Sequence, residues 1–399
     1  MKNDDRFPIP REWLSEEAVM LADSVARWAE REVVARRAKH REDFEALHRP
    51  ALRSLMGQVG LEDLLWGGEE VEPLSATTLA AALEQVGRAD TGLGVLLANT
   101  AAIQRCVPPE VRPRLSERGA LGALVLPGFA SGPPSGTGPD GARESADGLH
   151  GLTPQVTARA TDGGWSLHGR AVRPQCHGAR AAYFGLVTDL DGEPALFAVG
   201  ATARGLRVGE PFLKTGLHSS VNADLDLRGV AVSTEDLLVR GWAPYREVLS
   251  WYYLGCAATA SGALLATHGI VDDWCDSRVI KGRSQPFKDN PLVAALLGEI
   301  GGLTATGRIL MVHLARRLDT AGGADEADHA TAVAITRTVV RGAMDGLDRA
   351  MELMASAGYA TEWNLERYWR DVRTLGTYLM LETVGPMDLA RHYFGCGNL

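Results

Sequence analysis

From Tyr245 to the C-terminus, the sequence carries four long stretches in which apolar residues recur with helical spacing. They cover residues 245–280, 290–320, 325–357 and 363–394. The second stretch opens with Asn290 as an expected N-cap and Pro291 at the first helical position, where a missing N–H is tolerated. Four such helices predict a C-terminal four-helix bundle over residues 241–399.

The two preceding segments have different patterns. Residues 1–120 show helical periodicity, with Ser15 as an expected N-cap, and predict an N-terminal helical domain. Residues 121–240 contain short alternating runs separated by tight-turn sequences at 162–164 and 190–193, which predict antiparallel hairpins. Gly, Pro and Ser dominate residues 128–151, so we expect a loop there. The sequence therefore predicts an α+β chain with a small β domain between two helical domains.

Composition narrows the class of protein. The net charge is −9 and Lys and Arg are scattered, so the basic stripe that nucleic-acid binding requires is missing. The five cysteines form no Cys-x-x-Cys pair, and they predict neither a disulfide framework nor a metal site. The N-terminal stretch is charged and interrupted by proline, and no run approaches the ~18 apolar residues of a membrane span. We expect a cytoplasmic protein.

Four local sequences resemble signatures of the acyl-CoA dehydrogenase family. They are "EQVGRADTGLGVLLANT" (84–100), "WSLHGRAVRPQCHGARAAYFGLVT" (165–188), "LKTGLHSSVNADLDLRGVAVSTEDLL" (213–238) and "SAGYATEWNLERYWRDVRTLGTYLML" (356–381). The last is similar to a specific family pattern at Gly358, Tyr359, Glu362, Glu366, Arg367, Arg370 and Asp371. The resemblance covers nearly the whole chain and implies the same three-part fold.

The charges in the last stretch also have a reading from spacing alone. Glu366 and Arg370 stand at i and i+4 on a helix, as do Arg367 and Asp371. Two ion pairs of this kind stabilise one face of a helix. We therefore expect these four residues to be scaffold and not to act in catalysis.

The resemblance implies a carboxylate base that removes the α-proton of an acyl thioester. The usual position of this Glu is occupied by Leu379, which cannot accept a proton, and the alternative position on the first bundle helix is occupied by Tyr252. Glu382 and Glu247 are candidates for a displaced base, and either is equally well explained as a surface carboxylate. The catalytic residue is therefore not assigned from the sequence.

The resemblance also implies FAD, weakly bound or shared with a partner subunit, and several of the family's flavin contacts are altered. Where the family has Thr-Glu-Pro, Trp-Ile-Thr and Arg-x-x-Phe-Gly, this chain has Val-Leu-Pro, Arg-Pro-Gln and Arg-x-x-Lys-Gly. We expect the flavin between the β domain and the bundle, with its pyrophosphate near Arg278. The expected binding positions are Val125, Pro127, Arg173, Gln175, Cys176, Arg278, Lys281, Gly282, Glu352, Ala355 and Ser356.

Isolated nucleophiles and histidines do not supply another mechanism. His168, His177, His218 and His313 are not paired with a Ser or Cys in a nucleophile motif, so each is expected to be structural. Cys176 is the one thiol near the expected flavin, and its simpler reading is a small buried apolar residue.

Three functions stay open at this point. The first is FAD-dependent oxidation of an acyl thioester bound to CoA or a carrier protein, or closely related redox chemistry, with an electron-transfer flavoprotein as acceptor. The second is a catalytically deficient partner subunit of a hetero-oligomeric acyl-CoA dehydrogenase. The third is a flavin-dependent monooxygenase on the same fold. Long amphipathic helices predict a homo- or hetero-oligomer, dimer or tetramer, formed through the C-terminal bundle.

Overall fold

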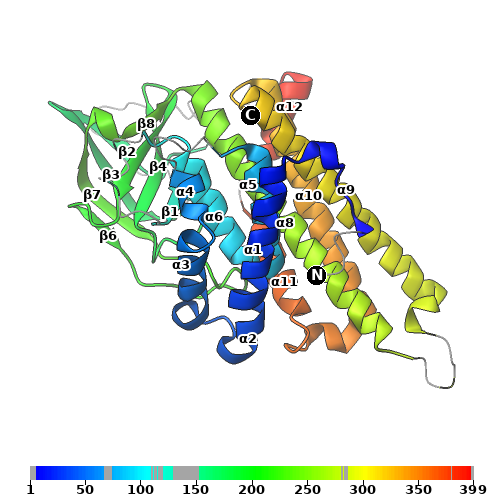
Figure 1. Ribbon diagram of the computed structural model, residues 1–399. Coiled ribbons are helices and arrows are strands. Elements are labelled where there is room, and N and C mark those ends of the chain that lie inside the picture. Colours follow the sequence, from blue (N-terminus) through cyan, green and yellow to red (C-terminus); the bar gives the residue numbers. More distant parts are fainter. Residues whose placement is uncertain are drawn as a thin grey trace.

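The computed structural model describes residues 6–66, 74–108, 111, 115, 120–128, 152–279, 282, 286–378 and 380–396. Most of the predicted Gly- and Pro-rich loop, Lys281 and Leu379 lie outside these residues. The order of elements is helices, then strands, then helices, which confirms the predicted α+β architecture. The strands lie on one side of the molecule and the helices on the other (Figure 1).

The N-terminal helices pack against the bundle. They are α1 (Glu16–Trp28), α2 (Ala35–His40), α3 (Arg49–Gly57), α4 (Leu61–Trp66), α5 (Ala76–Ala89) and α6 (Thr91–Gln104). Ser15 caps α1 as predicted, because its hydroxyl accepts from the N–H of Ala18 at 3.1 Å. Asp90 separates α5 from α6 and caps α6 by accepting from the N–H of Leu93 at 3.1 Å.

The β domain is made of two four-stranded sheets, ordered β1-β4-β5-β8 and β2-β3-β7-β6. Their strands are β1 (Gly122–Val125), β2 (Thr157–Thr161), β3 (Gly164–Val172), β4 (Tyr183–Leu190), β5 (Glu193–Gly200), β6 (Leu206–Val208), β7 (Leu225–Val232) and β8 (Leu237–Arg240). Both predicted hairpins form, β2 with β3 and β4 with β5. In the second, Asp191 and Gly192 have φ of 60° and 86°, as a tight hairpin turn requires.

One strand pairing adds to the predicted antiparallel hairpins. β1 pairs with β4 in parallel, from Gly122 opposite Tyr183 to Val125 opposite Leu186. Parallel neighbours need a long crossover connection, and the chain supplies one between β1 and β4 that includes β2 and β3. This crossover returns the chain to the bundle side of the β domain.

The C-terminal helices are α8 (Trp242–Asp276), α9 (Pro291–Ala321), α10 (Glu326–Met354), α11 (Leu365–Gly376) and α12 (Gly385–Phe394). Asn290 caps α9 as predicted, accepting from the N–H of Leu292 at 3.0 Å. The predicted fourth helix is interrupted: α11 ends at Gly376, and the chain is helical again from Met380, first as a π-helix (η8, Met380–Val384). The chain becomes α-helical again at Gly385, with Pro386 in the first turn, where proline is tolerated.

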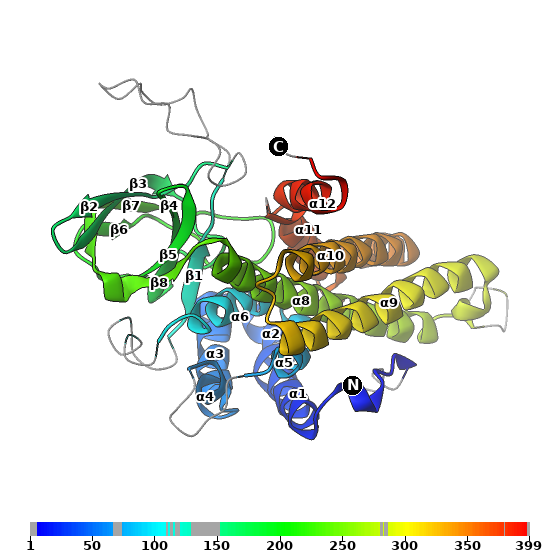
Figure 2. The ribbon, with the colours of Figure 1, turned by 90° about the horizontal axis from the view of Figure 1, so that it is seen from above.

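Two helices are long and apolar enough to cross a membrane by composition, and they differ in burial. The apolar window of α8 is 83% buried, because α5, α6, α9, α10 and α11 surround the helix. The corresponding window of α9 is only 33% buried. Figure 2 shows α8 running from the β domain to the far end of the bundle, where α9 begins.

Candidate functional site

A buried charged cluster joins the three domains. Its members are Arg37, Asp90, Arg367 and Asp371, all less than a tenth exposed. Asp90 lies 2.9 Å from Arg37 and 3.5 Å from Arg367. Burial acts to raise the pKa of the Asp90 carboxyl, and its interactions with His48 and with the guanidinium groups of Arg367 and Arg37 nevertheless hold that pKa below its ordinary value. The cluster therefore places a charged carboxylate at the centre of the fold.

The expected scaffold role of α11 is confirmed. Arg367 lies 3.6 Å from Asp371, and Arg370 lies 2.7 Å from Glu366. Asp371 also accepts a hydrogen bond from the N–H of Leu217, in the segment that leads into β7. Through Arg367, which pairs with Asp90, and Asp371, which binds the N–H of Leu217, α11 contacts both preceding domains.

The alternative base position lies in an interior centre, which we define as Cys176, Tyr252, Cys256 and Tyr378. Tyr252 is completely buried, and its hydroxyl has no hydrogen-bond partner. Burial raises the pKa of Cys176 and of Cys256 to about 12, and raises the pKa values of Tyr252 and Tyr378 well above the ordinary value. All four groups therefore keep their protons at neutral pH, and none of them is a general base.

The two candidates for a displaced base make surface ion pairs. Glu382 lies 2.7 Å from Arg341, with half of its side chain exposed. Glu247 lies 3.1 Å from Arg105, whose guanidinium stacks on the ring of Trp251 at 3.8 Å. Both carboxylates therefore make ion pairs outside the interior centre, as expected for surface carboxylates.

The described β-domain positions do not fit a flavin ring. Val125 and Cys176 are completely buried in the hydrophobic cores. Arg173 instead reaches Asp224 with two nitrogens, at 2.8 and 3.0 Å, and stacks on Phe212 at 4.8 Å. Its charge is therefore neutralised within the domain.

A side chain that the sequence did not single out joins the two segments expected to border the flavin. The amide of Gln155 donates to the carbonyl of Leu126 at 2.7 Å and accepts from the N–H of Arg173 at 2.8 Å. The N–H of Gln175 donates to the carbonyl of Leu124 at 2.8 Å. These main-chain groups are thus hydrogen-bonded within the protein itself.

The remaining flavin positions lie at the other end of the bundle. Arg278, at the end of α8, is exposed, stacks on Trp274 at 4.2 Å and has no ion pair with any described residue. Gly282 follows, and Glu352, Ala355 and Ser356 are exposed at the end of α10. Figure 2 shows this end opposite the β domain. One chain therefore does not bring Arg173 and Arg278 to the same flavin.

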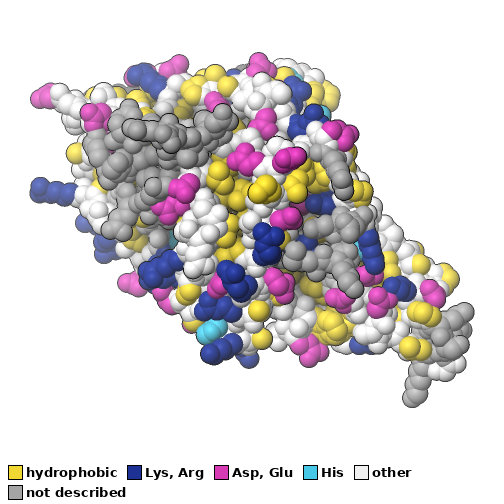
Figure 3. All heavy atoms as spheres, viewed as in Figure 1, with side chains coloured by type: hydrophobic (Ala, Val, Ile, Leu, Met, Phe, Trp, Pro, Cys, Tyr) yellow, Lys and Arg dark blue, Asp and Glu magenta, His cyan; other side chains and the backbone are white. Residues whose placement is uncertain are grey.

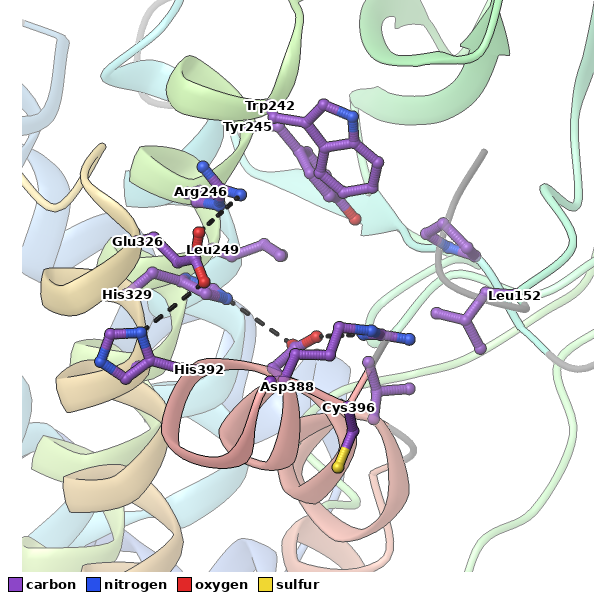
Figure 4. Close-up of a pocket in the computed structure, with 15 residues that line it drawn as sticks. Leu152, Trp242, Tyr245, Arg246, Leu249, Glu326, His329, Asp388, His392 and Cys396 are labelled. Carbon is purple, nitrogen blue, oxygen red and sulfur yellow. Dashed lines mark hydrogen bonds and ion pairs between the residues drawn. The ribbon is translucent and has the colours of Figure 1, made fainter. Parts of the chain in front are cut away.

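A cavity of about 370 Å³ lies where the start of α8, the start of α10 and α12 meet the β domain (Figure 4). Pro127, one of the expected flavin positions, lines it, and Tyr252, the alternative base position, does not. Its charged groups are paired: His329 lies 3.7 Å from Asp388, and Arg391 lies 3.0 Å from the same carboxylate. The sequence did not reveal this group, because its members come from separate helices.

The cavity group superficially resembles a Ser-His-Asp arrangement. The Oγ of Ser250 lies 3.2 Å from Nδ1 of His329, whose other nitrogen faces Asp388. However, Ser250 is completely buried and donates to the carbonyl of Arg246 at 2.7 Å. This hydroxyl is therefore a structural donor and not an accessible nucleophile.

Among the predicted structural histidines, His168 and His218 have hydrogen-bond partners and His313 lies at the surface. His168 lies 3.0 Å from Ser166, His218 lies 2.6 Å from Glu42, and His313 is exposed. His177 differs, because it is buried and its Nδ1 has no partner.

Comparisons with known proteins agree with this fold. Residues 239–379 match the family model for the C-terminal domain of acyl-CoA dehydrogenases. Glutaryl-CoA dehydrogenase of Mycobacterium smegmatis superimposes with a TM-score of 0.77 at 20% identity, covering 96% of this chain and 95% of that one. Butyryl-CoA dehydrogenase of Megasphaera elsdenii gives a TM-score of 0.77 at 19% identity, covering 95% and 98%.

A further neighbour is a chain from the structure of the electron transferring flavoprotein of Acidaminococcus fermentans, with a TM-score of 0.76 at 21% identity, covering 96% of this chain and 98% of that one. A 3-(aryl)acrylate reductase of Clostridium sporogenes is 25% identical over 198 residues, which is 49% of this chain. The match spans about half, 51%, of that curated relative. Together these relatives support a flavoprotein of dehydrogenase or reductase type. Residues 239–379 therefore match the C-terminal domain of acyl-CoA dehydrogenases in sequence, and the described chain as a whole has the fold of solved acyl-CoA dehydrogenases.

Proposed function

We propose that this chain is the non-catalytic partner subunit of a hetero-oligomeric flavoprotein of acyl-CoA dehydrogenase type. The observation that carries the proposal is the interior centre, where Tyr252, Cys256, Cys176 and Tyr378 all hold their protons. Loss of the base alone is a single change. Here it is combined with β-domain positions whose side chains are buried or paired within the protein, such as Val125, Cys176 and Arg173. Both the base and the usual flavin contacts are therefore altered, which supports the proposal.

The far end of the bundle supports a docking role. At this end, Leu292 in the first turn of α9 is 79% exposed, and Val279 in the segment that precedes α9 is 66% exposed. Charged side chains of both signs are scattered over the face seen in Figure 3, with apolar side chains between them. The apolar window of α9 is only 33% buried, which leaves an apolar face for a partner to cover. We assign it to a second, Glu-bearing family member, with Arg278 offered to the pyrophosphate of that subunit's FAD.

A second candidate, a reductase acting on an activated alkene, is favoured by the unpaired hydroxyl of Tyr252. A phenol whose pKa is raised is a poor base, but it is able to give a proton to a carbanion. The relation to the 3-(aryl)acrylate reductase points the same way. Flavin content separates the candidates, because a reductase working alone must retain its own cofactor.

The test is the absorbance spectrum and native mass of the protein, purified alone and with its partner. We expect no flavin bands and no oxidation of saturated acyl-CoAs from the chain alone, and flavin in the complex. Within the complex, Arg278→Gln should lower flavin retention, whereas Arg204→Gln, an exposed arginine of the β domain, should not. Stoichiometric flavin with turnover by the isolated chain would overturn the proposal.

The base position gives an independent check. Replacing Leu379 by Glu restores the group that contributes about 10² to 10⁴-fold in general-base catalysis. We expect no gain of acyl-CoA oxidation from this change alone, because the flavin positions of the described β domain stay closed. A measurable gain would place the chain among dehydrogenases that lack one group.

A further inference from the structure

A second groove lies where the N-terminal helices meet the β domain. It has a volume of about 400 Å³ and is bordered by the segment around Phe44, by α3 and by the loop before β4. Its lining includes Arg49 and Arg53 on α3, and His177 and Arg180 in the loop. None of these residues has a role in the function proposed above.

His177 is held in this groove by its backbone. Its φ is 55°, in the left-handed region, which costs energy for a residue other than glycine. The conformation is fixed because its N–H donates to the hydroxyl of Ser220 at 3.0 Å and its carbonyl accepts from the N–H of Ala181 at 2.9 Å. Strain that the surroundings maintain in this way is common at binding sites.

The His177 ring is short of a partner. The residue is 1% exposed, and its Nδ1 has no hydrogen-bond partner. The ring of Phe44 lies 5.3 Å away. Burial, together with nearby positive groups such as Lys214 and Arg180, lowers the pKa of His177 to about 3, so the ring is neutral. An unpaired polar group this deeply buried is uncommon in native proteins and calls for an explanation.

Positive charge is in excess around this ring. Arg49 and Arg180 share the carboxylate of Glu45, at 2.9 and 3.4 Å. Arg53 has no ion pair with any residue that the structure describes. Among the described lining residues Glu62 is the one carboxylate, so these residues together with Glu45 contribute two carboxylates and three guanidinium groups. The balance favours an anion.

The floor of the groove is apolar. Leu52 and Met56 of α3 and the ring of Phe44 line it beside the charged rim. The guanidinium of Arg49 lies over the Phe44 ring at 5.9 Å. A ligand that fits both parts has a charged head and a hydrocarbon body.

We propose that this groove binds a small organic anion, a carboxylate or phosphate ester on an apolar body, with its head among Arg53, Arg180 and His177 and its body over Leu52 and Met56. The two head groups share one chemistry, because guanidinium groups bind both in the same charge-assisted way. The site does not depend on the redox role of the chain, and it lies apart from the interior centre's Tyr252.

The test is titration of the full chain with hexanoate, hexyl phosphate and hexanol, followed by NMR of labelled histidine rings. We expect the anions, and not hexanol, to shift the His177 signal, which is assigned by its loss in His177→Asn. Asn is the chosen replacement because it tolerates positive φ. Binding of both anions identifies a general head-group site, and binding of hexyl phosphate alone identifies a phosphate ester.

Matched arginine variants test the placement. Arg53→Gln removes a charge that has no ion pair among the described residues, so it should leave the fold intact and weaken anion binding about tenfold. Arg204→Gln, on the exposed turn after β5, should leave binding unchanged. An unshifted His177 signal with both anions, or equal weakening in the two variants, would overturn the proposal.

Discussion

The charged cluster and the interior centre are two deeply buried polar regions with opposite chemistry. In the cluster, Asp90 is paired with Arg37 and Arg367. In the centre, Tyr252 has no hydrogen-bond partner and its cysteine neighbours keep their protons. Each region has members in the sequences that resemble family signatures, Asp90 and Arg367 in the cluster and Cys176 and Tyr378 in the centre. The comparison shows that charged side chains hold the domains of this chain together. The four residues of the interior centre, by contrast, include no charged group that would remove a proton.

The largest expected effect comes from breaking the cluster. Asp90→Ala leaves two buried arginines without their shared carboxylate and removes the cap of α6. We expect the free energy of unfolding to fall by about 3 to 5 kcal/mol, measured by urea denaturation. Glu366→Ala breaks a more exposed pair, with Arg370, and should cost less than about 1 kcal/mol. Equal losses in the two variants would mean that the cluster is no stronger than a surface pair.

Acid favours a positive charge on the buried ring of His177, which directly follows Cys176 of the interior centre. The pKa of His177 is about 3 in the folded chain and 6.5 when exposed, so the unfolded state binds more protons between these values. Stability therefore falls as pH is lowered from about 6.5 to about 3. In His177→Asn, the loss between pH 7 and pH 4 should be smaller by about 2 to 3 kcal/mol. Parallel denaturation curves for the two proteins across this range would contradict the neutral, buried state of the ring.

The smallest effect concerns a single hydroxyl. Tyr252→Phe removes an oxygen that has no hydrogen-bond partner, so stability should stay the same or rise slightly. Tyr183→Phe is the matched control, because that fully buried hydroxyl accepts from the amide of Gln104 at 2.6 Å. The control should lose about 1 kcal/mol by thermal or urea denaturation. A loss from Tyr252→Phe as large as that of the control would show that the Tyr252 hydroxyl has a stabilising partner.

Local chemistry explains what was predictable. The caps at Ser15 and Asn290 form as expected, because a cap needs only a side chain and an N–H two or three residues later. The hairpin at 190–193 and the ion pair between Glu366 and Arg370 likewise depend on neighbours in the sequence. The order of three domains followed from changes in periodicity.

Other features had no local signal. The parallel pairing of β1 with β4 joins residues about 60 positions apart. The bridge made by Gln155 between Leu126 and Arg173 involves three separate segments. Periodicity and spacing report on one element at a time, so they do not reveal which segments meet.

By itself, the sequence determined the α+β class, the family resemblance and the absence of a carboxylate at positions 379 and 252, because these follow from residue types and their spacing. Only the tertiary structure decided that Val125 and Cys176 are packed shut, that Arg278 lies at the far end from Arg173, and that His177 faces a groove with three arginines. The physical reason is that burial, and with it the charge state of a group, depends on all the segments packed around it.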